Sequence, residues 1–211
     1  LLLGVAGQFL IMPLYAYGLS RLARLPEALS LGLVITCSAP GGGGGYLYSL
    51  LLGGDVTLAI SMTLISTVVA AAAMPLSSAL YGWLLGVHAA LHVPFVKILG
   101  TLLFLPLPIS LGMLVKLRLP AVTSVLLTLI RPFSFVLIVC GIYKAYQMGS
   151  SILANMNPPI VAAGVTVPVF GLLVGLGLAR LAGLQLPPKK TVLIKMGVQN
   201  NLLALAVMQL S

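Results

Sequence analysis

Two short stretches of this 211-residue chain combine residues that could bind a small ion or a charged group of a solute. Residues 38–46 read Ser-Ala-Pro-Gly-Gly-Gly-Gly-Gly-Tyr, inside apolar sequence where a helix would otherwise continue. Proline fixes φ and lacks an N–H, and glycine imposes no preferred geometry, so Pro40 to Gly45 are expected to interrupt the helix. The half-helix ends would offer N–H groups and carbonyl oxygens, which suit small ions and charged solute groups.

The second stretch, residues 195–200, places Lys-Met-Gly-Val-Gln-Asn in the middle of an apolar run. Polar side chains at membrane depth are expensive and are usually functional, which draws attention to Lys195, Gln199 and Asn200. We expect a second broken helix here. Two discontinuous segments in separate halves of a chain indicate a secondary transporter with a binding site near the bilayer midplane. For the first stretch, a flexible glycine linker or tight packing of small residues is the alternative.

No group of residues favours covalent or acid–base chemistry, so we expect neither an enzyme nor a bound cofactor. Cys37 and Cys140 both lie in apolar runs, without the spacing of a disulfide framework or a zinc site. His88 and His92 are four residues apart, but the sequence lacks the His-Glu-x-x-His pattern of a metal site.

Composition indicates the class of protein that positions these stretches. Hydrophobic residues make up 60% of the chain and charged residues 6%, with a mean hydropathy of +1.19. Soluble domains carry about 25% charged residues, so we predict an all-α, multi-pass transmembrane protein with about seven spans. The net charge of +9 reflects the presence of only two acids, Glu27 and Asp55, rather than a basic patch. The expected environment is the lipid bilayer, and nucleic-acid binding is excluded.

The apolar runs predict where the polar residues lie along the spans. The first span, residues 1–20, carries Gln8 near its middle. The second, residues 27–52, is interrupted, and neither half alone can cross a hydrocarbon core of about 30 Å. Asp55 is the predicted N-cap of the third span, which holds Thr63 in its early turns. Further spans are predicted at residues 93–115, 120–147, 152–179 and 191–211. The chain has no initiator Met and stops inside an apolar run, so we expect a piece of a longer protein.

Several motifs, taken in order, resemble those of the sodium/bile acid cotransporter family, solute carrier family 10. They are Gln8-Phe9 with Met12-Pro13, Cys37 to Gly42, Gly54-Asp55, Met62-Thr63 with Ser66-Thr67, and Gly197 to Asn200. The resemblance covers essentially the whole chain. It implies nine or ten membrane helices divided into a core domain and a panel domain, with two broken helices crossing in the core beside two sodium sites.

The same resemblance implies a division of the chain. Residues 1–86 are expected to form a first core repeat of three spans, the second of them broken at residues 38–46. Residues 93–148 are expected to supply panel-type helices. Residues 149–211 are expected to begin a second core repeat and to stop within the second broken helix.

Site residues follow from the resemblance one position at a time. Gln8 matches the family's sodium-site glutamine on the first core helix, and Thr63 matches the threonine after the first break. Gln199 and Asn200 match the Gln-Asn pair at the second break. The resemblance therefore implies Gln8, Thr63 and Gln199 as sodium ligands.

Other positions of the first break depart from the family's pattern. Pro40 and Gly41 keep the Pro-Gly-Gly run and remain candidates for the ion and substrate site. Gly45 and Tyr46 stand where the family has Ser-Asn and are also candidates for this site, and Ala59 stands where the family has a serine. By this comparison three oxygen ligands of one sodium site are missing.

Lys195 is the largest departure, because it stands where the family has a glutamate shared by both sodium sites. Two cations about 4 Å apart repel by about 4 kcal/mol at an effective dielectric constant of about 20, which lowers ion affinity about a thousandfold. Three interpretations remain open. The ammonium could occupy the ion position, burial could leave the lysine uncharged, or the residue could be a sequence error or local variant.

The resemblance implies a sodium/organic anion symporter of the bile acid type, with degraded sodium sites, that works by alternating access. Bile acids, steroid sulfates and smaller carboxylates are all compatible with an apolar cavity between helices. The alternative is a transporter-derived membrane protein that no longer moves solute and serves as a scaffold or regulatory partner.

Overall fold

A computed structural model describes the chain apart from residues 1, 87–99, 101–105, 156–157 and 199–211. In the described part, the regular elements are helices, as the composition predicts. Four of them are long and apolar enough to cross a membrane: Leu2–Leu22, Val56–Leu85, Pro120–Lys144 and Val161–Leu181. The predicted multi-pass, all-α architecture is therefore confirmed.

The first span is helical from residue 2 to residue 22, but it contains a wider turn that the sequence did not predict. It comprises α1 (Leu2–Ala6), the π-helical turn η1 (Gly7–Ile11) and α2 (Met12–Leu22). In η1 the Met12 N–H donates to the Gly7 carbonyl, five residues back. Pro13 explains the wider turn, because its ring would clash with the carbonyl four residues earlier in a regular α-helix.

The second span is broken, as predicted, but the break is shorter than expected. α3 (Glu27–Ser38) ends before Ala39, whose backbone is extended, and α4 (Gly43–Leu51) begins after Gly42. The expectation that the whole glycine run interrupts the helix is wrong, because residues 43–45 form the first turn of α4. A first turn has few intrahelical N–H bonds to make, so glycine is tolerated there and only residues 39–42 are needed to separate the halves.

The third span, α5 (Val56–Leu85), begins and ends as its sequence predicts. The Asp55 carboxylate accepts a hydrogen bond from the Leu58 N–H at 3.0 Å, so Asp55 is an N-cap. Gly86 follows the last turn with φ of 80°, a left-handed conformation that glycine adopts readily.

The middle of the chain forms α7 (Pro106–Arg118) and α8 (Pro120–Asn155), and the next helix is α9 (Pro158–Leu181). The predicted fourth span falls partly outside the described residues. The predicted start of the sixth span at residue 152 is wrong, because residues 152–155 continue α8. No proline interrupts that stretch, whereas Pro158 suits the first turn of a new helix.

α10 (Pro188–Gly197) is a half-length helix that packs back along α9. An ideal Cβ on Gly171 would lie 2.9 Å from the Met196 carbonyl carbon, and one on Gly175 would lie 2.9 Å from the Leu193 Cα. Glycine at these two positions therefore permits close backbone approach. Val198, with an extended backbone, ends α10 within the apolar run, and the continuation of the predicted second break lies outside the described residues.

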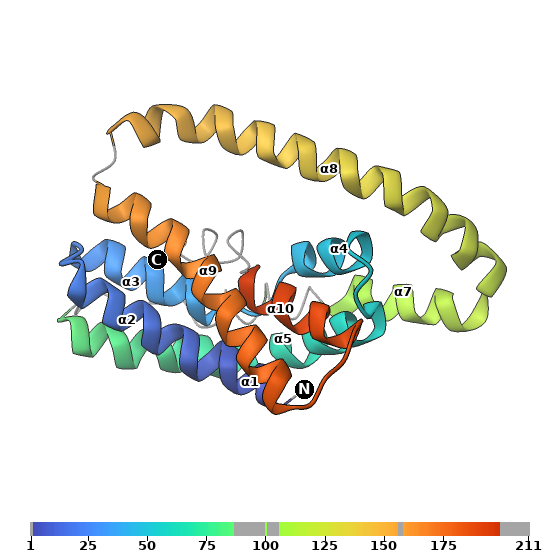
Figure 1. Cartoon of the computed structure of the whole chain (residues 1–211), viewed down its shortest axis with the longest axis horizontal. Coiled ribbons are helices and arrows are strands. Elements are labelled where there is room, and N and C mark those ends of the chain that lie inside the picture. The colour runs from blue at the N-terminus through green and yellow to red at the C-terminus, as the bar shows by residue number, and fades with distance from the viewer. Residues whose placement is uncertain (1, 87–99, 101–105, 156–157, 199–211) are drawn as a thin grey trace.

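Figure 1 shows how these helices are arranged. α1 to α5, α9 and α10 gather into one bundle, whereas the long α8 runs along one side of it. The buried core of the bundle draws on the first span, α3, α5, α9 and α10, through residues that include Met12, Val34, Met62, Val167 and Met196. Large apolar side chains of α8, such as Phe133 and Phe135, are exposed, which suits a helix that faces lipid.

Candidate functional site

Inside the bundle, the break between α3 and α4 meets the last turn of α10 at the side chain of Lys195. This side chain is 3% exposed. Its ammonium nitrogen donates to the carbonyls of Gly41 at 3.4 Å and Gly42 at 3.3 Å, and to the hydroxyl of Thr63 on α5. We call these three oxygens the lysine cage. The lysine therefore joins α10 to the first break and to α5.

Glycine at position 45 makes room for the lysine chain. An ideal Cβ on Gly45 would lie 2.9 Å from the Lys195 Cδ and 3.4 Å from its Nζ. A Cβ on Gly41 would be in ordinary contact with the same chain, at 3.4 Å from Cδ. Of these two predicted site positions, Gly45 is therefore the one at which the lysine chain depends on the absence of a side chain.

The Thr63 oxygen can accept a hydrogen bond from Lys195 because the Thr63 hydroxyl hydrogen is donated elsewhere. Its hydroxyl donates to the Ala59 carbonyl one turn earlier, at 2.9 Å, which leaves the oxygen to accept from the ammonium. Thr67, one turn later, has its hydroxyl directed to the Thr63 carbonyl at 2.8 Å. Of these two buried threonines, Thr63 is the one whose hydroxyl accepts from the Lys195 ammonium.

Gln8 contacts the same break from the first span. Its side-chain nitrogen donates to the Ala39 carbonyl at 2.8 Å, and the side chain is buried in the wide turn η1. Pro40 is also fully buried. Gln8 thus holds the Ala39 carbonyl of the break, and Lys195 holds the carbonyls of Gly41 and Gly42.

The other end of α10 is anchored at the connection between α4 and α5. The Thr191 hydroxyl donates to the Asp55 carbonyl at 3.1 Å, and the Lys190 ammonium donates to the Leu52 carbonyl at 3.2 Å. An ideal Cβ on Gly54 would lie 2.7 Å from the Thr191 hydroxyl, so this approach also depends on glycine. α10 is consequently fixed to the first part of the chain at both ends.

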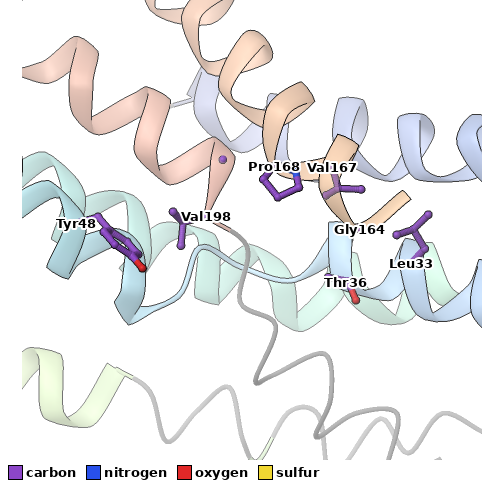
Figure 2. Close-up of a pocket in the computed structure, with 8 residues that line it drawn as sticks. Leu33, Thr36, Tyr48, Gly164, Val167, Pro168 and Val198 are labelled. Carbon is purple, nitrogen blue, oxygen red and sulfur yellow. The ribbon is translucent and has the colours of Figure 1, made fainter. Parts of the chain in front are cut away.

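A cavity of about 400 Å³ opens beside the end of α10. Tyr48 and Val198 lie at one end of it, and Leu33 and Gly164 lie at the other (Figure 2). Its lining is mainly apolar and comes from α3, α4, α9 and the end of α10: Leu33, Thr36, Tyr48, Gly164, Val167, Pro168, Gly197 and Val198.

The structure brings together some of the residues that the sequence predicts for the site. Gly41, Gly45, Thr63 and Lys195 surround one point. Gln8 and Pro40 lie at the preceding part of the break, and Tyr46 is half-buried in α4. Gln199 and Asn200 lie outside the described residues, so the sodium ligation predicted for Gln8, Thr63 and Gln199 stays a prediction.

Sequence reasoning did not identify the carbonyls of Ala39 and Gly42 as hydrogen-bond acceptors, nor the cavity-lining residues. A carbonyl belongs to every residue, so only the helix break itself could have pointed to those two. In the described part of the chain no three His, Cys, Asp or Glu side chains gather to hold a metal. The His88 and His92 pair lies outside the described residues.

The fold and the site define a class: an all-helical, multi-pass membrane protein with a helix broken in its interior beside the end of a half-helix. Comparison gives the family. The sodium bile acid symporter family matches residues 1–156, and the chain belongs to that family. The family is one of symporters, which agrees with the expectation that the chain is not an enzyme.

Individual relatives match along the whole chain. It is 58% identical to the P3 protein of Homo sapiens over 211 residues and 47% identical to sodium/bile acid cotransporter 5 of Mus musculus over 211 residues. Identity to sodium/bile acid cotransporter 4 of Homo sapiens is 31% over 219 residues. The chain covers 44%, 49% and 48% of those three proteins, so it spans about half their length.

Proposed function

We propose that the chain is part of a secondary transporter that moves an organic anion of the bile acid type across a membrane by alternating access. The carrying observation is the interior helix break at residues 39–42, which faces the last turn of α10. Non-helical backbone at membrane depth is tolerated only where it is buried in protein or lines a cavity. A protein that merely needed to span the bilayer would have no use for such a break.

The cavity beside the break supports a binding role. Its volume of about 400 Å³ lies within the range of about 300–1,000 Å³ that small-molecule sites occupy. Apolar side chains predominate, with a hydroxyl each from Thr36 and Tyr48 to orient a solute. That lining suits a largely apolar solute with few polar groups.

Two observations favour an anion over a cation. None of the described residues that line the cavity carries a carboxylate, and the chain as a whole has a net charge of +9. Relatives are named sodium/bile acid cotransporters, and bile acids combine an apolar body with a negative group.

We also propose that the division of the chain expected from its sequence is the mechanical one. Residues 1–86 and the chain from α9 onward would supply the core, and the panel would extend from residue 93 to the end of α8 at residue 155 rather than to residue 148. In support, α1 to α5 pack with α9 and α10 in one bundle while α8 runs along its side (Figure 1). Movement of one group of helices against the other would expose the cavity to each side of the membrane in turn.

The test is uptake by the full-length protein reconstituted in proteoliposomes, with a radiolabelled conjugated bile acid and a steroid sulfate as probes. Uptake and counterflow are measured with and without a sodium gradient, against protein-free liposomes. We expect counterflow of at least one probe. Absence of counterflow for both probes, in a preparation that unfolds cooperatively on heating, would count against transport.

A second function is favoured by one specific observation, the position of Lys195. A transporter-derived scaffold or regulatory protein does not need a free ion site, so it could function with these oxygens permanently bonded to the Lys195 ammonium. The counterflow assay separates the two, because a scaffold would show no exchange of either probe.

A further inference from the structure

The three oxygens around the Lys195 ammonium have the make-up of a small-cation site. Two are backbone carbonyls from consecutive residues of the helix break, and one is a hydroxyl. Hard cations in proteins are held by carbonyl, hydroxyl and carboxylate oxygens. Here the described partners of the ammonium are uncharged oxygens. Without the lysine, these oxygens would face the protein interior with no cation beside them.

We propose that the Lys195 ammonium is a permanently bound cation that replaces sodium where the α3–α4 break meets the last turn of α10, and that the chain therefore binds no free sodium there. Family membership implies a sodium ion, but the residues present do not fit one. The Lys195 side chain occupies the space beside Gly45 that a side chain at position 45 would fill. Its nitrogen is hydrogen-bonded to the carbonyl oxygens that a sodium ion would need as ligands.

The count of donors and acceptors indicates that the lysine is charged. An ammonium has three N–H donors and no acceptor, and the lysine cage offers three acceptors. The Thr63 hydroxyl belongs among them because its own hydrogen is given to Ala59. An uncharged amine would have only two hydrogens, so its lone pair would face the Thr63 oxygen as long as the Thr63 hydroxyl donates to Ala59.

The charge excludes a second cation by simple repulsion. At about 4 Å separation and an effective dielectric constant of about 20, two unit charges reduce affinity about a thousandfold. The inference goes beyond the proposed transport and does not depend on it, because it concerns cation binding at rest. A protein that fails to transport could still confirm it, and one that transports could still refute it.

The first experiment uses the unmutated full-length protein in detergent or nanodiscs. Its melting temperature is measured in sodium chloride, potassium chloride and choline chloride at equal ionic strength. We expect the same melting temperature in all three salts. A rise that is specific to sodium, and saturates with its concentration, would overturn the proposal.

The second experiment empties the lysine cage. Lys195→Ala removes the ammonium and leaves space, so we expect a lower melting temperature that sodium or methylammonium raises and choline does not. Lys195→Met fills the space with an apolar chain, so we expect a lower melting temperature without rescue. Lys189→Ala, on the same helix, is the control and should respond to no cation.

The proposal is wrong if Lys195→Ala melts at the unmutated temperature, or if sodium and methylammonium fail to raise its melting temperature above that in choline. If Lys195→Ala does not fold in any salt, the sodium titration of the unmutated protein still decides the question.

Discussion

At the scale of single residues, the lysine cage combines one side chain with backbone that any sequence could supply. Lys195 and Thr63 are the two side chains that take part, and the other two oxygens belong to glycines. Which cation these oxygens hold therefore depends on where the helix breaks and on which side chain of α10 extends toward the break. A change at residue 63 or 195 alters the chemistry directly, whereas the carbonyls can be altered only by moving the backbone.

Thr63→Val tests the side-chain partner of the lysine. Valine keeps the shape of threonine but cannot accept a hydrogen bond, so the buried ammonium loses one of its three acceptors. We expect a loss of stability of about 1.5–3 kcal/mol, the range for a hydrogen bond to a charged group. Thr67→Val is the control, because that hydroxyl bonds only to a backbone carbonyl of its own helix, and it should cost less than about 1 kcal/mol. Equal melting temperatures for the two variants would contradict the assignment.

The sequence identified most of these residues but could not fix their partners. Lys195 was recognisable because polar side chains at membrane depth are usually functional, and Thr63 was recognisable because it matches a threonine of the family's pattern. Their meeting across 132 positions of sequence depends on the packing of α10 against the first part of the chain. Gln8 was expected near the ion position, and its amide nitrogen lies 3.7 Å from an ideal Cβ on Gly41 while it donates to the Ala39 carbonyl at the start of the break. Its role as an ion ligand stays a prediction.

At the scale of helices, short-range signals were reliable at the ends of α5 and unreliable in the first break. Asp55 caps α5 through its own side chain, three residues from the N–H that it accepts, so this role could be predicted from sequence alone. The glycine run could not be divided in this way, because glycine is compatible with both the break and the first turn of α4. The wide turn η1 had only one signal, Pro13, and such turns are too rare to predict from one proline.

Asp55→Ala tests the N-cap of α5. Loss of the carboxylate leaves the Leu58 N–H without its 3.0 Å partner, so we expect a loss of stability of about 1 kcal/mol. Asp55→Asn retains a capping oxygen and should melt close to the unmutated protein. Thermal unfolding of the purified variants measures both, and equal losses for alanine and asparagine would show that charge rather than capping is important.

Gly171→Ala tests the close packing of α9 on α10. The added methyl would lie 2.9 Å from the Met196 carbonyl carbon and nearer still to its oxygen, and backbone cannot move aside as a flexible side chain can. We expect a loss of about 1–3 kcal/mol. Gly177→Ala on the same helix meets nothing within 4 Å, so it should be neutral or should stabilise by up to about 1 kcal/mol. If both variants melt alike, α9 and α10 are farther apart than the 2.9 Å approach at Gly171 implies.

At the scale of the whole molecule, the division between the bundle and α8 is the feature on which the proposed transport depends. Composition was sufficient to predict a multi-pass membrane protein, because an apolar content of 60% leaves no soluble alternative. It could not predict that α8 extends to Asn155 or that it runs apart from the bundle. Helices that are apolar on every side carry no periodic signal to show which face is packed.

Gly164→Phe tests the cavity as the solute site. An ideal Cβ at this position meets nothing within 4 Å, and the residue lines the cavity, so a phenylalanine ring can enter it without displacing neighbours. We expect uptake or counterflow to fall about tenfold or more, equivalent to about 1.4 kcal/mol, with an unchanged melting temperature. Val165→Phe, at the next and exposed position, is the control and should retain activity. Full activity in Gly164→Phe would place the solute elsewhere.

The dependence of α10 on oxygens from residues 41, 42 and 63 has a consequence for biosynthesis. A lysine at the centre of an isolated spanning helix opposes insertion by about 2.5–3.5 kcal/mol. Ribosomes deliver α10 about 130 residues after α5 begins, when the earlier helices are already in the membrane. We therefore expect the nascent amino-terminal helices to supply the oxygens that let this lysine enter the bilayer, and we expect damage to those helices to prevent insertion of the later segment.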